Sequence, residues 1–341
     1  MVFNLIKKQA KISKVFEMKN ETVIISDTHI GDPDFTQDRK QQFFDFLENY
    51  VKPKADELIL LGDIFEITQA SLLDVYRGAT DLLMKLAEVA LSGTKISYIL
   101  GNHDLDFTNT RGIDIALPNV TVKGPKEQKL VVRREVPHTT EQKASEREIV
   151  STFTSAEERT IKGHKVYLAH GHEYNHYFAG DPKRYDILVK IGAAIERTLG
   201  PEADDWILNF WEEVRHGISK LFYSSEETPG RIGGMREDLV SDILAARDIL
   251  KFEIQDDKIV PRKEKLDVVV FGHTHRARKV KVRDDIREWA GEELGVYLNC
   301  GAWVTTVKMA TFCVFRDDGS FDVYEYMGKG KSRALKWWEP I

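Results

Sequence analysis

Histidine and aspartate residues recur in this sequence directly after short apolar runs, in combinations that suit metal binding. Asp27 and His29 follow the run 22–26 (TVIIS), and Asp63 follows the run 57–61 (ELILL) after a single glycine. At the end of a strand, a spacing of two residues places Asp27 and His29 on one side of the pleat. Carboxylate together with imidazole suits manganese, iron or zinc better than calcium or magnesium, which prefer oxygen ligands alone.

Three more apolar runs end in the same way. They cover 95–100 (KISYIL), 165–169 (KVYLA) and 267–271 (DVVVF), and they lead into Gly101-Asn102-His103-Asp104, His170-Gly171-His172 and Gly272-His273-Thr274-His275. Seven ligand-type side chains exceed what one tetrahedral ion needs and suit two ions that share a bridging carboxylate. The predicted ligands are Asp27, His29, Asp63, Asn102, His170, His273 and His275. The residue pattern alone leaves open whether His170 or His172 is the ligand.

The elements between these clusters indicate an α/β layered domain. Helical spacing at 36–51 and 70–91 alternates with the early strands. In such sheets, ligands bind beyond the carboxyl ends of the strands, where all five clusters fall. After residue 295, the runs VYLNCGAWV, MATFCVFR and FDVYEYM predict antiparallel strands that complete a second sheet.

Two stretches interrupt this alternation. Residues 121–160 are polar and predict an insertion of hairpin or loop character, whereas 183–258 have helical spacing, with a third helix over 235–251. We expect the helical segment to form a cap over the site. The predicted organisation is an N-terminal arm (1–20), a first part of the core (21–182), the cap (183–258) and a second part of the core (259–341).

Composition restricts the class of protein. The 341 residues include 42% hydrophobic residues, enough for a sizeable core, and the net charge of -6 argues against a general nucleic-acid binder. Cys300 and Cys313 are the two cysteines, which we interpret as inert buried thiols in a reducing compartment, and hence a cytoplasmic protein. No apolar stretch is long enough to span a membrane. The N-terminal residues favour an ordinary packed arm over a basic amphipathic segment that makes a peripheral membrane contact.

Taken in order, the five motifs resemble those of the calcineurin-like metallophosphoesterase superfamily. The resemblance implies a four-layer αββα sandwich of two mixed β-sheets flanked by helices, with a helical insertion before the last metal-binding motif. It favours His170 over His172 as the ligand. It implies one metal ion held by Asp27, His29, Asp63 and His275, and a second held by Asp63, Asn102, His170 and His273. It also places His103 near the scissile phosphate, where this residue would stabilise the transition state or protonate the leaving oxygen, with Asp104 orienting its ring.

The reaction implied is hydrolysis of a phosphoester or pyrophosphate bond by a hydroxide between two divalent cations, with manganese expected before iron or zinc. The segments LGDIFE, GNHDLDF and HGHEYN most resemble the UDP-2,3-diacylglucosamine pyrophosphohydrolase branch. That resemblance implies a phosphorylated small-molecule, nucleotide-linked or lipid-linked substrate. The alternatives are a broad-specificity or cyclic-nucleotide phosphodiesterase, a protein phosphatase and a non-enzymatic scaffold.

Several residues beside the motifs have two interpretations. His172, Arg184 and Arg276 are candidates for substrate binding, and a surface role explains each of them as well. For Glu66, a helix cap is favoured over a contact with the ligand shell. The sequence predicts no oligomeric state.

Overall fold

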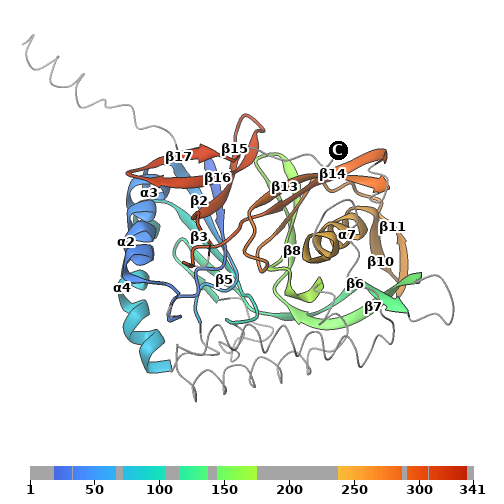
Figure 1. The fold of residues 1–341 in the computed structure, drawn as a ribbon, viewed down its shortest axis with the longest axis horizontal. Helices are drawn as coiled ribbons and strands as arrows, with labels where there is room; N and C mark the ends of the chain where they lie inside the picture. Colours follow the sequence, from blue (N-terminus) through green and yellow to red (C-terminus); the bar gives the residue numbers. More distant parts are fainter. Residues whose placement is uncertain are drawn as a thin grey trace, which may run out of the picture.

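The computed structural model describes most of the predicted core (Figure 1). The described residues are 19–32, 34–66, 72–104, 115–136, 144–174, 237–285, 290–305 and 307–335. Most of the predicted N-terminal arm, most of the predicted cap and Arg184 lie outside them. No helix in these ranges is long and apolar enough to cross a membrane.

The larger sheet has eight strands in the order β17-β16-β15-β1-β2-β3-β5-β4. Strands β1, β2, β3 and β5 run parallel, whereas β15 pairs antiparallel with β1 and β4 pairs antiparallel with β5. The strands are β1 (Glu21–Ile25), β2 (Ala55–Leu61), β3 (Lys95–Ile99), β4 (Ile115–Leu117), β5 (Val120–Lys123), β15 (Thr311–Arg316), β16 (Phe321–Gly328) and β17 (Lys331–Ala334).

The smaller sheet has five strands in the order β13-β14-β12-β9-β8. Its three central strands run parallel and its two edge strands antiparallel to their neighbours. The strands are β8 (Glu157–Ile161), β9 (His164–Leu168), β12 (Val268–Phe271), β13 (Arg278–Asp285) and β14 (Ala290–Asn299).

The assignment of the C-terminal strands to a second sheet is wrong in part. Only β14 joins the smaller sheet, where it runs parallel to β12, while β15 and β16 extend the larger sheet beside β1. The physical reason is that β1 is fully buried and needs a partner on its open edge, which β15 provides with an almost wholly buried strand. Apolar spacing predicts such strands but does not specify which sheet they enter.

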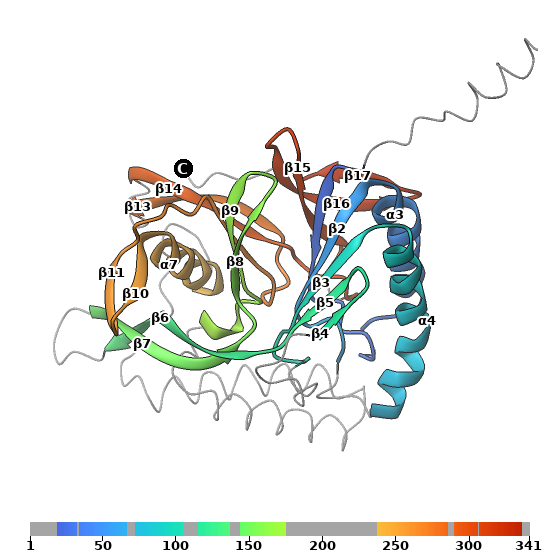
Figure 2. The same ribbon diagram turned by 180° about the vertical axis from the view of Figure 1, so that it is seen from behind.

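Helices cover the outer faces of both sheets, so the molecule has the four layers expected of an αββα sandwich (Figures 1 and 2). Helix α2 (Gln37–Phe46), its continuation through η1 (Leu47–Val51) and α3 (Lys52–Lys54), and α4 (Leu72–Leu91) lie against the larger sheet. Helix α7 (Glu237–Lys251) packs against the smaller sheet. The α/β fold class predicted from the sequence is confirmed.

Alternation along the strands produces separate apolar layers. On β2, Leu58 and Leu60 pack toward the helices, whereas Ile59 and Leu61 pack between the sheets. Strand β12 alternates in the same way between the inter-sheet layer and α7. Burying an apolar side chain of this size stabilises the fold by roughly 1.5–3 kcal/mol. A strand with two buried faces therefore stabilises both the layer under the helices and the layer between the sheets.

Two hairpins flank α7 on its side of the molecule (Figure 2). Strands β6 (Lys126–Val136) and β7 (Ala144–Thr154) form the hairpin expected within the polar segment, and β10 (Phe252–Gln255) pairs with β11 (Lys258–Pro261). Leu130 and Val132 of β6 are buried in the same layer as α7. Helix α7 matches the third helix predicted at 235–251, and its packing ties that part of the predicted cap to the smaller sheet.

The two cysteines meet between the sheets. Cys300 follows β14 and Cys313 lies on β15, so each comes from a different sheet, and their sulfur atoms are 3.4 Å apart. Both side chains are fully buried free thiols. Burial raises the pKa of the Cys300 thiol well above its ordinary value, which favours the protonated form, and the burial of both thiols is as the sequence predicted.

Candidate metal centre

The ends of five parallel strands meet at one edge of the two sheets. Strands β1, β2 and β3 of the larger sheet lead into the clusters at 27–29, 62–63 and 101–104. Strands β9 and β12 of the smaller sheet lead into the clusters at 170–172 and 272–275. All seven predicted ligands therefore lie in loops at the carboxyl ends of strands.

Five of these seven residues have left-handed backbone conformations, which non-glycine residues rarely adopt. The φ angles are 52° at Asp27, 44° at His29, 52° at Asp63, 64° at His273 and 56° at His275. Each such residue costs of order 1–3 kcal/mol, and the conformation persists only where the surroundings fix it. Half of the ten described non-glycine residues with positive φ thus present donor atoms at this one edge.

Glycines allow the loops of the two sheets to approach each other. Gly62 has a φ of 80°, and a Cβ atom there would lie 2.5 Å from His170 Nδ1. A Cβ atom on Gly272 would lie 2.5 Å from Asp27 Oδ2. Any larger residue at either position would push the two sheets apart at the site.

One group of donors consists of Asp27, His29 and His275. The His275 Nε2 atom lies 3.2 Å from both His29 Nε2 and Asp27 Oδ1. His29 Nε2 lies 3.8 Å from the same Asp27 oxygen. The group thus combines two residues of the larger sheet with one of the smaller sheet, and its donor atoms lie within 4.8 Å of one another.

A second group consists of Asp63, His170 and His273. His170 Nε2 lies 2.9 Å from Asp63 Oδ2, and the rings of His170 and His273 are 5.3 Å apart. The same Asp63 oxygen lies 3.9 Å from His29 Nε2, which places this carboxylate between the two groups. Asn102 is buried in the loop after β3, and its neighbour His103 donates its backbone N–H to Asp63 Oδ1 at 2.9 Å.

Two buried donor atoms of the site lack, among the described residues, the hydrogen bonds that buried acceptors normally form, as expected of atoms that coordinate a cation. His170 Nδ1 donates to the carbonyl oxygen of Leu61 at 3.0 Å, which leaves the Nε2 lone pair available. This Nε2 atom and Asp27 Oδ1 are buried, and their contacts with Asp63 Oδ2 at 2.9 Å and His275 Nε2 at 3.2 Å do not have the geometry of a hydrogen bond. A buried acceptor without a hydrogen bond is unfavourable, and coordination of a cation would remove that cost at both atoms.

Carboxylates and imidazoles in the cluster shift each other's pKa. Burial disfavours the charged form of Asp63, but His170 and His103 hold the pKa of its carboxyl well below the usual range. Burial also opposes a charge on His170, yet Asp63 and Asp27 raise its pKa to about 10. Burial and the neighbouring His170 and His172 hold the pKa of His273 well below its ordinary value. Since protons and cations compete for these donor atoms, cation binding would release protons.

His103 is oriented by Glu66 rather than by Asp104. Glu66 Oε2 lies 2.6 Å from His103 Nδ1 and 2.9 Å from His29 Nδ1, so one buried carboxylate contacts both rings. Asp104 instead accepts backbone N–H groups of Phe65 at 2.9 Å and Gly101 at 3.1 Å. The orienting role expected of Asp104 is wrong because its fully buried carboxylate is occupied by the loops after β2 and β3. The structure therefore shows the contact of Glu66 with the predicted ligand shell, whereas the residues 67–71, where a helix cap would lie, are outside the described residues.

Comparison with known proteins identifies the family. The calcineurin-like phosphoesterase family profile matches residues 21–277, which include every residue of both donor groups. The chain belongs to the calcineurin-like phosphoesterase family. This phosphoesterase is therefore a metal-dependent phosphohydrolase, and a comparison with curated proteins returns no match.

Three solved structures illustrate the similarity of this phosphoesterase to known folds. An uncharacterised protein from Streptococcus pneumoniae, described as a predicted phosphoesterase, is 12% identical, with a TM-score of 0.32 over 93% of this chain and 97% of that one. A Vps29 double mutant from Entamoeba histolytica gives 12% identity and a TM-score of 0.32 over 92% and 97%. A nuclease from Pseudomonas putida gives 20% identity and a TM-score of 0.20 over 35% and 56%.

His172 lies beside the phosphoesterase donor groups. Its ring is 5.7 Å from that of His170 and 6.2 Å from that of His273, and burial lowers its pKa. Glu173, which the sequence analysis did not single out, accepts the Gly171 N–H at 3.1 Å and a hydrogen bond from Thr154. It thereby holds the loop between the two histidines, a role without a sequence signal. Arg276 is half-buried directly after His275.

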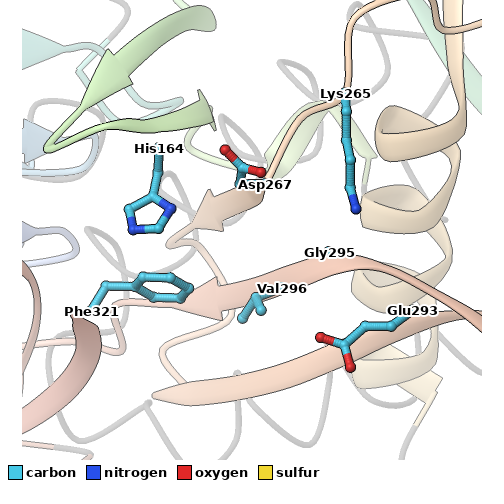
Figure 3. Close-up of a pocket in the computed structure, with 7 residues that line it drawn as sticks. All are labelled: His164, Lys265, Asp267, Glu293, Gly295, Val296 and Phe321. Carbon is cyan, nitrogen blue, oxygen red and sulfur yellow. The ribbon is translucent and has the colours of Figure 1, made fainter. Parts of the chain in front are cut away.

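A hollow of about 260 Å³ lies at the other end of the smaller sheet of this phosphoesterase (Figure 3). His164 and Asp267 line it from the amino ends of β9 and β12, and Phe321 meets the His164 ring edge-on at 4.9 Å. The other lining residues are Lys265, Glu293, Gly295 and Val296. None of the seven belongs to either donor group, so the donor groups and this hollow are separate features of the sheet.

Proposed function

We propose that the chain hydrolyses a phosphoester or pyrophosphate bond with a pair of divalent cations. The observation that carries the proposal is the pair of adjacent donor groups with the Asp63 carboxylate between them. Asp27, His29, Asp63 and His275 would hold one cation. Asp63, Asn102, His170 and His273 would hold the other. Such cations supply a nucleophilic hydroxide near neutral pH and neutralise charge on the phosphoryl group, and manganese suits this donor set best.

His103 is our candidate for the general acid. Its Nδ1 atom is held by Glu66, which orients the ring and favours its protonated form. Although burial opposes the charge, Asp63 and Glu66 raise the pKa of His103 above its ordinary value. A protonated imidazole can donate to the leaving oxygen, a contribution typically worth about 10²–10⁴ in rate.

The substrate class proposed is a phosphorylated small molecule, nucleotide-linked or lipid-linked. Its support is the resemblance of the segments at 61–66, 101–107 and 170–175 to the UDP-2,3-diacylglucosamine pyrophosphohydrolase branch. His172 and Arg276 are candidates for contact with the substrate because they adjoin the donor groups. A cytoplasmic location belongs to the same proposal, supported by the two free thiols.

One experiment tests this function. The purified protein is stripped of metal with a chelator, reloaded with Mn²⁺, and assayed against mono-, di- and pyrophosphate esters, including a nucleotide-linked diphosphate. We expect two Mn²⁺ ions per chain and hydrolysis that depends on them. Hydrolysis that is unchanged after metal removal would contradict the proposal. A preference for phosphopeptides or cyclic nucleotides would show that the proposed substrate class is wrong.

A further inference from the structure

The loop Gly272–His275, which carries two predicted ligands, is tightly folded. His273 and His275 both have left-handed backbone conformations, with Thr274 between them. The Thr274 N–H donates to the Gly272 carbonyl at 2.8 Å, and the His273 N–H donates to Asp27 Oδ2 at 3.0 Å. The backbone alone does not favour this conformation, so side chains around the loop must hold it.

The hydroxyl of Thr274 is fixed from two sides. It donates to Asp242 Oδ2 on α7 at 3.3 Å and accepts from Asn299 Nδ2 at 3.1 Å. Asn299 Nδ2 also donates to the Gly272 carbonyl at 2.7 Å. A hydroxyl that both donates and accepts has a defined orientation. The Thr274 side chain is therefore held between α7 and the smaller sheet by hydrogen bonds on both sides.

Asp242 has an unusual position for a carboxylate. It is 8% exposed on the face of α7 that packs against the smaller sheet, and its Oδ2 atom also accepts from the Tyr297 hydroxyl at 2.6 Å. Burying a carboxylate is unfavourable unless it is hydrogen-bonded, and apolar residues would serve the packing of α7 better. Packing therefore does not explain Asp242, whereas its contact with the ligand-bearing loop does.

We infer that Asp242 is a positioning residue for the metal centre. Through Thr274 it holds the loop in the conformation that brings His273 and His275 to the two donor groups. The inference rests on the proposed dinuclear centre and extends it to a residue on an outer helix. Partners behind metal ligands commonly change metal affinity by about 10–100-fold when they are replaced.

The test compares Mn²⁺ binding by calorimetry and the Mn²⁺ electron paramagnetic resonance spectrum in full-length variants. Asp242→Asn and Thr274→Val should each weaken Mn²⁺ binding by about 10-fold or more, while Thr274→Ser, which keeps the hydroxyl, should restore wild-type binding. Asp248→Asn is the matched control. Asp248 is a carboxylate of the same helix, 2% exposed and paired with Arg147 at 3.1 Å. We expect that variant to melt at a lower temperature without losing Mn²⁺ affinity.

The outcomes separate the inference from the proposed function. If wild-type protein binds Mn²⁺ and hydrolyses its substrate while Asp242→Asn and Thr274→Val bind as tightly, the positioning role is wrong and the function stands. If wild-type protein binds no Mn²⁺, both fail together. Should Asp242→Asn not fold, the Thr274→Val and Thr274→Ser pair decides the matter, since equal binding by the two would overturn the role.

Discussion

The two sheets contribute different chemistry to the site. The larger sheet provides the carboxylates, with Asp27 and Asp63 among the donors and Glu66 and Asp104 beside them. The smaller sheet provides the imidazoles of His170, His273 and His275 and no carboxylate of either donor group. At the seam, the line where the two sheets meet, the carboxylates of the donor groups therefore all come from the larger sheet, and the smaller sheet contributes imidazoles. Cations at the seam would add to the links between two sheets that already meet through apolar packing and ion pairs, such as that of Arg159 with Glu57 at 3.0 Å.

The sheets also differ in how they hold their ligands. The loops after β1 and β2 are joined backbone to backbone, since the N–H groups of Asp27, His29 and Ile30 donate to Gly62, Asp63 and Ile64. The loop after β12 depends more on side chains, namely those of Asn299 and Asp242. The difference predicts that substitutions near the smaller sheet alter ligand geometry more readily than equivalent substitutions near the larger sheet.

The largest effect should come from Asp63, which lies between the two donor groups. Asp63→Asn removes the charge that both cations would share, so we expect Mn²⁺ affinity and turnover to fall by more than the roughly 100-fold typical of supporting residues. Metal analysis and steady-state kinetics measure this. Asp56→Asn is the control, because Asp56 lies on β2, the strand that leads to Asp63, but pairs with Lys162 at the surface. Comparable losses in the two variants would rule out a special role for Asp63.

His103 belongs to the larger sheet but lies outside the proposed ligand set. His103→Ala should lower turnover by about 10²–10⁴ while the protein keeps both metal ions. His164→Ala is the control. His164 lies at the amino end of β9, away from the donor groups, and is hydrogen-bonded to the Gly319 carbonyl, so its replacement should leave turnover unchanged. A His103→Ala protein without metal would show that His103 is a ligand.

Glu66 allows a test of whether a neighbouring carboxylate raises the pKa of His103. Its pKa is held near 2, mainly by His103 against the opposing effect of burial, so the carboxylate is ionised in the neutral range. Its negative charge raises the pKa of His103, and Glu66→Gln should lower that pKa. Because the protonated form of His103 is active as an acid, the alkaline limb of the kcat/KM profile should shift to lower pH. A shift to higher pH would contradict the assignment.

The smallest effect concerns stability. A cation that binds only the folded chain stabilises it by about 2.7 kcal/mol at 100 times its Kd, so in a chain of 341 residues chelation should lower the Tm by roughly 4 °C for each cation removed. Differential scanning calorimetry with and without chelator measures the shift. Asp63→Asn provides the comparison and should show little response to chelator. An equal response in both proteins would mean that the cations stabilise another part of the fold.

Much of the core and both donor groups could be predicted because the information is local. Each ligand follows a recognisable strand, and parallel strands bring their carboxyl ends to one edge. The partnership of Glu66 with His103 could not be predicted, since it depends on how two loops 37 residues apart fold toward each other. The placement of β15 beside β1 depends likewise on pairing across most of the chain.

The contact between Cys300 and Cys313 lies where the two sheets pack against each other, so these thiols can report on the separation of the sheets. Because the sulfurs come from opposite sheets and are wholly shielded from solvent, a thiol reagent can reach them only when the sheets part. The labelling rate of the native protein would therefore report how often the two sheets separate, without any substrate and without an engineered cysteine.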